Sequence, residues 1–396
     1  MSTTREVFLV SAARTAIGTF GGSLKDVPNT QLATTVVKAA IAGAGIAADA
    51  VGHVVMGNVI PTDTKDAYLA RVAAIDAGCP IETPAFNVNR LCGSGLQAIV
   101  SAAQTLLLGD AQIAIAGGVE NMSRAPYIAP AHRFGARMGD SVMQDMMTGA
   151  LSDPFEKMHM GVTAENVARE YGVSRQQQDE LAVISHQRAA NAIDQGYFKE
   201  QVVPIVMKSR KGDIAFDTDE HVRRDITLEG LSALKPVFVR EAGTVTAGNA
   251  SGINDGAAAL VLMNGNMVKE RGVKPLGRLV AYGHAGVDPR LMGIGPVPAT
   301  RNALAKAGLK IEDMDVIEAN EAFAAQACAV SQQLGMDPAK VNPNGSGIGL
   351  GHPVGATGAI ITVKALYELQ RIGGRYALVT MCIGGGQGIA AIFERV

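Results

Sequence analysis

The chain contains 396 residues, with 35 basic and 37 acidic side chains and a formal charge of −2 at pH 7. This length exceeds the roughly 250–300 residues at which a single hydrophobic core stops growing, so we expect two or three domains. The balanced charge argues against a non-specific nucleic-acid or membrane-surface binder, because both need an excess of basic residues. We therefore expect neither nucleic acid nor a membrane as a partner.

The four cysteines, Cys79, Cys92, Cys328 and Cys382, are too few for a disulfide framework, and none pairs at metal-ligand spacing. The first residues lack the apolar core of a secretory signal, and the last four are not a peroxisomal address. We expect a reducing, cytoplasmic location and no metal site.

The first strongly patterned element is an uncharged stretch over residues 91–109. Gln97, Ser101 and Gln104 interrupt it, so it predicts a buried helix rather than a membrane span. Cys92 lies at its start and is followed by Gly-Ser-Gly. A lone cysteine is more often a packing residue, but small neighbours let a ligand approach and a helix start favours the thiolate. Cys92 is thus a candidate nucleophile.

An apolar strand at 113–116 and a Gly-rich turn follow, and then comes a long segment, 121–251, without a counterpart in the second half. It carries a helical pattern over 163–171, and a buried strand begins at Asn254 after it. Insertions at the carboxyl ends of sheet strands are where α/β proteins bind ligands. We expect this segment to cover the substrate.

Two further candidates lie near the C-terminus. His352 stands between Gly and Pro in a turn, and Cys382 follows an apolar strand and precedes Gly384. A structural turn histidine and a packing cysteine are the plain alternatives. However, imidazole has the side-chain pKa best suited to proton transfer near neutrality. Two thiols and one base can form an acyl-transfer site.

The two halves of the chain repeat each other at a shift of 263 residues, from Ser94 to Thr357. Identical pairs across the two predicted helices are Gly95/Gly358, Val100/Val363, Ala102/Ala365 and Leu106/Leu369. Alternating apolar runs and helical segments predict α/β layers around a mainly parallel sheet. We expect one copy over 1–120 plus 252–272, an inserted domain over 121–251, and a second copy over 273–396.

Six motifs together resemble the thiolase family, the acetyl-CoA C-acyltransferases, along essentially the whole chain. They are Asn89-Arg-Leu-Cys-Gly-Ser-Gly, His159-Met-Gly-Val-Thr-Ala-Glu, Thr246-Ala-Gly-Asn-Ala-Ser-Gly, Asn320-Glu-Ala-Phe-Ala-Ala-Gln, Gly351-His-Pro-Val-Gly-Ala-Thr-Gly and Met381-Cys-Ile-Gly-Gly-Gly. The resemblance implies an α/β thiolase fold, a duplicated five-layer αβαβα architecture with an inserted loop domain. It also implies a homotetramer, a dimer of dimers, with residues 121–140 as the tetramerisation loop.

The implied activity is a reversible Claisen condensation of two acyl-CoA thioesters, acetyl-CoA with acetyl-CoA or a short acyl-CoA, to 3-ketoacyl-CoA and CoA. The chain resembles bacterial β-ketothiolases that supply acetoacetyl-CoA or 3-ketovaleryl-CoA for polyester synthesis. The alternative is a degradative 3-ketoacyl-CoA thiolase of fatty-acid β-oxidation with a broader chain-length range. CoA thioesters would be substrates, so no separate cofactor is expected.

The resemblance assigns a role to each catalytic candidate. Cys92 carries the acyl group, and His352 activates it and helps to bind the thioester oxygen of the second substrate. Cys382 removes the C2 proton of that substrate. Backbone amides at Cys92 and Gly384 stabilise the acyl-enzyme oxygen, and Asn320, through a water, serves the enolate together with His352. Loop capping is the competing explanation for Asn320.

Residues expected at the CoA site are His159 and Ser251 near the pantetheine arm, lined by Phe238 and Phe323. Arg223 would pack on the adenine, although Arg224 beside it leaves the register open by one residue. Arg210 would steer the ribose phosphate. Solvated surface charge is the alternative for these arginines.

Two finer hypotheses follow. Met158 precedes His159, where short-chain thiolases usually carry an aromatic residue, and a flexible Met there would border the acyl tail and broaden specificity. In addition, converging thiols at Cys92 and Cys382 with raised thiolate character and solvent access would be open to oxidation to a disulfide.

Two rival classes remain. A ketoacyl synthase would decarboxylate malonyl thioesters, but such sites pair one Cys with two His or with His and Asn, so the thiol at Cys382 argues against it. A nucleotide or lipid carrier built on the Gly-rich run 345–351 is weakly supported, because the run lacks G-x-G-x-x-G spacing and a P-loop Lys.

Overall fold

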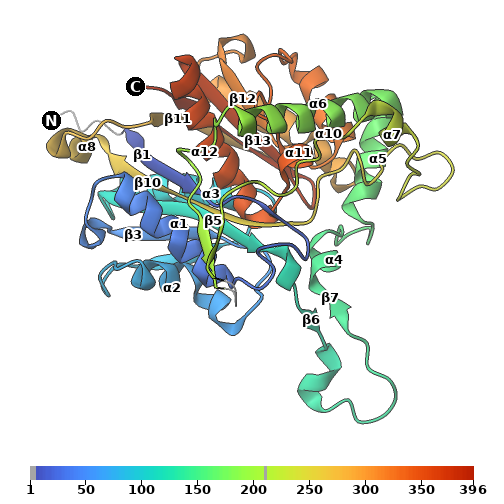
Figure 1. The fold of residues 1–396 in the computed structure, drawn as a ribbon, viewed down its shortest axis with the longest axis horizontal. Coiled ribbons are helices and arrows are strands. Elements are labelled where there is room, and N and C mark those ends of the chain that lie inside the picture. Colours follow the sequence, from blue (N-terminus) through green and yellow to red (C-terminus); the bar gives the residue numbers. More distant parts are fainter. Residues whose placement is uncertain (1–5, 209–211) are drawn as a thin grey trace.

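The computed structural model describes residues 6–208 and 212–396, and within them one ten-stranded sheet runs through the molecule (Figure 1). Its order is β12-β13-β14-β11-β1-β10-β5-β3-β4, with β2 paired to β10. The first half supplies β1 (Val7–Arg14), β2 (Gly18–Thr19), β3 (His53–Gly57), β4 (Ala85–Val88), β5 (Ile113–Asn121) and β10 (Asn254–Asn264). The second half supplies β11 (Gly277–Gly286), β12 (Val316–Ala319), β13 (Tyr376–Ile383) and β14 (Gln387–Glu394).

Helices cover both faces of this sheet in layers. Outer helices α1 (Asn29–Gly43) and α2 (Leu69–Asp76) pack on the first half, and α9 (Pro296–Ala307) packs on the second with α10 (Ala324–Leu334) beside it. Between the halves lie α3 (Ser94–Leu108) and α12 (Val354–Ile372), which contact each other and strands of both halves. Each half of the sheet forms one layer, with α3 and α12 between the two halves and the other helices outside. The resulting order of helix, half-sheet, helix, half-sheet, helix confirms the predicted αβαβα architecture.

The duplication is equally visible. β3 and β12 begin at His53 and Val316, and β5 and β13 begin at Ile113 and Tyr376, so both pairs keep the shift of 263 residues read from the sequence. The two half-sheets meet where β1 pairs with β11. Outward from this junction the strands follow as β1-β10-β5-β3 on one side and as β11-β14-β13-β12 on the other, so corresponding strands take corresponding places. The repeat therefore corresponds to a structural duplication.

The repeated glycines explain how the two central helices meet. A Cβ at Gly95 of α3 would lie 2.6 Å from the backbone nitrogen of Ala359, and a Cβ at Gly358 of α12 would lie 2.3 Å from that of Leu96. Each glycine therefore admits the backbone of the other helix, which no larger residue would allow. This contact fixes the starts of α3 and α12, where Cys92 and His352 lie.

The expectation of a mainly parallel sheet is wrong. Only β3 with β4, β3 with β5, and β12 with β13 pair in parallel among the described strands. β13 and β14 are joined by a short turn at residues 384–386, which forces an antiparallel pair. Helices bury both faces of the sheet, so its strands have the continuous apolar character usual for parallel sheets.

The inserted segment, residues 121–251, adds short strand pairs and several helices to the first half. They are β6 (Tyr127–Ile128), β7 (Gln144–Asp145), α4 (Met146–Ala150), α5 (Met160–Glu170), α6 (Arg175–Asp194), β8 (Ile205–Met207), β9 (Ile214–Phe216) and α7 (Leu228–Ser232). α5 and α6 pack against α10 of the second half, and the arm at β6 and β7 projects from the body (Figure 1). The remaining helices are α8 (Gly265–Arg271) and α11 (Gly347–Leu350), with 3-10 turns at Ala48–Ala50, Thr64–Tyr68, Met122–Arg124, Pro130–Phe134, Pro289–Ile294 and Ile311–Asp313.

Among the described residues, one stretch is long and apolar enough to cross a membrane, Leu91–Leu108. It contains α3, which packs between the two half-sheets against α12. The stretch is therefore the buried helix that its polar interruptions predicted.

Candidate active site

Cys92 lies in a tight turn directly before α3. The preceding residue, Leu91, has a φ of +46°, in the left-handed region that leucine rarely adopts. Asn89 holds the turn: its Oδ1 accepts a 3.0 Å hydrogen bond from the Leu91 N–H, and its Nδ2 donates to the Val59 carbonyl at 3.2 Å. The constrained turn fixes the direction in which the Cys92 thiol leaves the backbone.

The same turn packs on the end of β13. A Cβ at Gly93 would lie 2.6 Å from Cδ1 of Ile383, so the two segments pack closely and a larger residue at this position would displace the Ile383 side chain. Cys382 immediately precedes Ile383, and the Cys92 thiol is near enough to act electrostatically on it. The structure thus brings together the two thiols that the sequence predicted to converge.

His352 lies in the turn before α12 and is 4% exposed. Its backbone N–H donates to Asn254 Oδ1 at 2.9 Å, and its ring Nδ1 lies 2.7 Å from Thr357 Oγ1. On the other side of the ring, Nε2 lies 3.4 Å from Nδ2 of Asn320. His352 and Asn320, predicted to act together, are neighbours, and Asn320 Oδ1 is buried and has no hydrogen-bond partner among the described residues.

A cavity of about 380 Å³ collects most of the predicted residues. Its lining is mainly apolar and includes seven of them: Cys92, His159, Phe238, Ser251, Phe323, His352 and Gly384. Cys382 is fully buried and belongs to one hydrophobic cluster with Met160, Met292 and Ala322, which line this cavity. The cavity therefore ends at a nucleophile, a base and a second thiol.

Both thiols are protonated at neutral pH. Burial raises the pKa of Cys92 to about 11, although the backbone N–H groups of Gly384 and of Cys92 itself act against the rise. Burial is the main cause that raises the pKa of Cys382, and the nearby Cys92 thiol adds to the rise. The expectation of raised thiolate character is therefore wrong, because no cation among the described residues offsets the desolvation of the thiols. The expectation of solvent access is also wrong for Cys382, because its side chain is fully buried.

His352 has the opposite shift. Burial lowers its pKa from 6.5 to about 4, so the imidazole is neutral around pH 7 and can accept a proton. The resting pair is a neutral thiol and a neutral base, in which proton transfer accompanies nucleophilic attack. The N–H groups of Cys92 and Gly384, expected at the acyl oxygen, both converge on the Cys92 sulfur.

Aromatic rings form one wall of the cavity. His159 begins α5, where its Nδ1 accepts a 3.0 Å hydrogen bond from the Gly161 N–H, and its ring stacks on Phe238 with centroids 4.7 Å apart. Phe238 meets Phe323 edge to face at 6.4 Å. Ser251 is tied to the same wall by its N–H, which donates to the Ala322 carbonyl at 3.0 Å. A flat apolar wall of this kind suits an extended acyl or pantetheine chain.

The two candidate arginines behave differently. The guanidinium of Arg224 pairs with Asp194 of α6 through two hydrogen bonds of 2.9 Å. Arg223 is held by its backbone N–H, which donates to His186 Nδ1 at 3.0 Å, and its side chain is exposed. Arg223 is thus the better candidate of the two, although neither lines the cavity. Arg210 lies outside the described residues.

Family comparisons agree with this geometry. The model described as "Thiolase, N-terminal domain" matches residues 7–266, and that described as "Thiolase, C-terminal domain" matches residues 273–395. The chain belongs to the thiolase family. This thiolase is 69% identical over 393 residues to the β-ketothiolase BktB of Cupriavidus necator, covering 99% of this chain and 100% of the relative. It is 50% identical to an acetyl-CoA acetyltransferase of the same organism, over 98% of this chain and 99% of that one.

Solved structures give the same answer. The acetyl-CoA acetyltransferase of Bacillus anthracis superposes on the thiolase with a TM-score of 0.97 and 46% identity, covering 100% of both chains. Human mitochondrial 3-ketoacyl-CoA thiolase in complex with CoA superposes with a TM-score of 0.96 and 45% identity, covering 100% of this chain and 99% of that one. These likenesses span the whole chain, including the inserted segment.

One expectation about specificity is wrong in this thiolase. Met158 does not line the cavity, and its sulfur lies 4.0 Å from Asn166 Nδ2 instead. Met160 and Met292 line it and belong to the same hydrophobic cluster as Cys382. His159 caps α5, and Met160, the first residue of that helix, lines the cavity.

Sequence reasoning also missed Glu120, at the end of β5. Its buried carboxylate accepts hydrogen bonds from Asn58 Nδ2 and from the backbone N–H groups of Val59, Ile60 and Gly355, all at 2.9–3.1 Å. Burial raises its pKa to about 8, and these backbone donors act in the opposite direction. A lone acidic residue at the end of an apolar strand was the available signal. Glu120 ties the turn that carries His352 to the first half of the thiolase.

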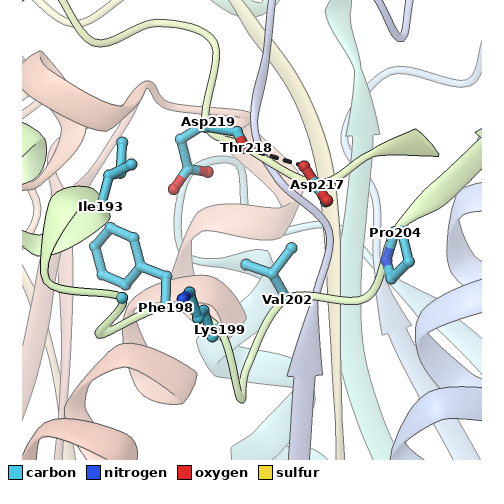
Figure 2. A pocket seen from close by; sticks show the side chains of 9 residues that line it. Ile193, Phe198, Lys199, Val202, Pro204, Asp217, Thr218 and Asp219 are labelled. Atoms are coloured by element: carbon cyan, nitrogen blue, oxygen red, sulfur yellow. Dashed lines mark hydrogen bonds between the residues drawn. The ribbon is translucent and has the colours of Figure 1, made fainter. Parts of the chain in front are cut away.

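A second cavity, of about 260 Å³, lies apart from these residues (Figure 2). Phe198, Lys199 and Asp219 contribute to its lining. The Asp219 carboxylate forms two hydrogen bonds, of 2.7 and 2.9 Å, with the buried guanidinium of Arg14, which also stacks over Phe198. This arrangement fastens the inserted segment to β1 and contains none of the predicted catalytic residues.

Proposed function

We propose that this thiolase catalyses the reversible condensation of acetyl-CoA with acetyl-CoA or a short acyl-CoA to 3-ketoacyl-CoA and CoA, through an acyl-Cys92 intermediate. The observation that carries the proposal is one apolar cavity bordered by Cys92 and His352, with Cys382 buried next to it. The 69% identity to a β-ketothiolase favours this activity over degradative thiolysis of long chains.

In the first half-reaction, Cys92 Sγ attacks the thioester carbonyl while His352 Nε2 takes the thiol proton. The negative charge on the carbonyl oxygen is stabilised by the N–H groups of Cys92 and Gly384, which already converge on the sulfur. The tetrahedral intermediate collapses to acetyl-Cys92, and the departing CoA sulfur takes the proton from His352. The base is then neutral again.

In the second half-reaction, His352 Nε2 takes the thiol proton of Cys382, and the resulting Cys382 thiolate removes a C2 proton from the second thioester. The enolate oxygen is stabilised by Asn320 and by the Nε2–H of the His352 imidazolium. The enolate carbon then attacks the carbonyl of acetyl-Cys92, the Sγ–acyl bond breaks to release the 3-ketoacyl-CoA, and His352 returns its proton to the Cys92 sulfur. The burial that raises the pKa of Cys382 makes its thiolate a stronger base, which suits a weakly acidic C–H bond. In thiolysis the same residue, as a thiol, protonates the leaving enolate.

We propose a cytoplasmic homotetramer that binds CoA and acyl-CoA and needs no separate cofactor. The support for assembly is the projecting arm, where Tyr127, Phe134 and Met138 are 59%, 88% and 96% exposed. Apolar side chains exposed to this degree on one extension are typical of an oligomer contact. The CoA complex of human mitochondrial 3-ketoacyl-CoA thiolase supports CoA thioesters as ligands.

One steady-state series tests the activity: thiolysis of C4, C5, C6 and C10 3-ketoacyl-CoA esters, with acetyl-CoA condensation measured alongside. We expect turnover of the C4 and C5 esters and little with C10. A preference for C10 would instead support the degradative alternative. Malonyl-CoA decarboxylation, or the absence of turnover with every ester, would overturn the proposal.

A further inference from the structure

The side chain of Thr357, in the first turn of α12, lies directly against the His352 ring. Its Oγ1 is 2.7 Å from His352 Nδ1 and 2.9 Å from the carbonyl oxygen of Pro353. Both side chains are buried, at 2% and 4% exposure. Thr357 does not line the cavity, so it acts on the reaction through His352.

One arrangement of the protons makes both contacts hydrogen bonds. A hydroxyl group has a single proton, and the Pro353 carbonyl can only accept a hydrogen bond. The Thr357 hydroxyl therefore donates to Pro353 and offers a lone pair to His352. In this arrangement Nδ1 of the ring carries the proton and donates a hydrogen bond to Thr357 Oγ1.

The other side of the ring agrees with this assignment. A neutral imidazole protonated at Nδ1 has a lone pair at Nε2. Asn320 presents its amide nitrogen, a donor, to Nε2 at 3.4 Å. A proton on Nε2 would instead face a donor and leave no base for the Cys92 thiol.

We propose that Thr357 is a positioning residue that holds His352 in the Nδ1–H tautomer and keeps Nε2 available as the base for Cys92. This inference rests on the proposed acyl-transfer function. Burial of both side chains leaves the Nδ1–H without another acceptor when the hydroxyl is removed, so the tautomer preference is lost with it.

The chain offers a matched control on the same helix. Thr362 of α12 is also fully buried, and its hydroxyl also donates to the carbonyl four residues earlier, Gly358, at 2.7 Å. Within the described part of the chain, its hydroxyl makes no hydrogen bond with His352. Thr357→Val and Thr362→Val therefore each remove a buried hydroxyl from a helix, but only the first removes the histidine contact. Thr357→Ser retains the hydroxyl.

The test measures acetoacetyl-CoA thiolysis and the rate at which iodoacetamide alkylates Cys92, followed by peptide mass spectrometry. We expect Thr357→Val to lower kcat by roughly 10- to 100-fold, within the contribution of general-base catalysis, with KM unchanged. Alkylation at neutral pH should slow in parallel and approach the wild-type rate near pH 11, where the thiol ionises unaided. Thr357→Ser and Thr362→Val should resemble the wild type.

The outcomes separate the two proposals. An inactive wild-type enzyme would overturn the proposed function, whereas an active wild type with an equally active Thr357→Val variant overturns the tautomer proposal alone. Equal losses in Thr357→Val and Thr362→Val, or a deficit in Cys92 alkylation that persists at high pH, would show a merely structural effect and would also overturn it.

Discussion

The carboxylate of Glu120, in the first half of the chain, accepts a 2.9 Å hydrogen bond from the backbone N–H of Gly355, in the first turn of the helix after His352. Cys92 belongs to the first half and His352 to the second, so the catalytic pair spans the duplication. Glu120 is a polar link across that boundary, and its other oxygen ties it to the loop after β3.

Replacing Glu120 by alanine should therefore destabilise the protein strongly. The change leaves several buried N–H donors unsatisfied, which costs about 3–5 kcal/mol of the free energy of unfolding. Glu220 is the matched control, because it also accepts several hydrogen bonds, from Thr19 and Ser23, but is exposed. Urea unfolding of both alanine variants measures the difference, and similar small losses would contradict this role.

The pH dependence of Cys92 acetylation should be broad. Burial holds the pKa of His352 near 4 instead of 6.5, so the base loses function only as the pH falls through about 4. The alkaline change is set by Cys92, whose pKa is raised to about 11. Single-turnover acetylation by labelled acetyl-CoA should thus show no transition near pH 6.5. A half-maximal rate near 6.5 would show that the histidine is solvated or charged in the free enzyme.

Acyl-chain length should depend on Met160. This residue lies beside Cys382 and lines the inner part of the cavity, so Met160→Ala adds space where the acyl tail of the substrate lies. We expect the ratio of kcat/KM for the C6 ester to that for the C4 ester to rise by roughly 10-fold, because accommodating additional methylene groups in an apolar pocket changes discrimination by about this much. Met158→Ala, outside the cavity, is the control. A similar ratio in both variants would refute the assignment.

The projecting arm should control assembly. Phe134 and Met138 are almost fully exposed in the single chain, so replacing both by serine removes apolar area from the contact without disturbing the core. We expect the double variant to sediment as a smaller oligomer than the wild type while keeping its melting temperature. An unchanged mass in sedimentation would place the oligomer contact elsewhere.

Most of the predicted site residues lie around one cavity, and the sequence could single them out because their signals are local. Cys92 and His352 each precede a central helix at equivalent points of the repeat, and Gly95 and Gly358 mark the place where those helices cross. The αβαβα layers followed from the family motifs and the repeat. Whether each side chain performs its assigned role remains a prediction.

The missed features depend on tertiary structure. Glu120 bonds to Gly355, which is distant in the sequence and adjacent only in the fold. Thr357 contacts His352 only because of the geometry of the turn between them. The thiol pKa values depend on how completely the insertion buries the site. Strand direction was misjudged because apolar strands buried on both faces look alike whether parallel or antiparallel.

The most direct test of the whole account is one experiment on Cys382→Ser with acetyl-CoA in deuterium oxide, with the wild type and Cys92→Ser beside it. In the proposed mechanism, Cys92 accepts the acyl group and Cys382 transfers the C2 proton. We therefore expect that Cys382→Ser still acquires an acetyl group on Cys92, detected by peptide mass spectrometry, but no longer exchanges the methyl protons of acetyl-CoA. Cys92→Ser should acquire no acetyl group. Wild-type exchange in Cys382→Ser, or an acetyl group on any residue other than Cys92, would contradict the account.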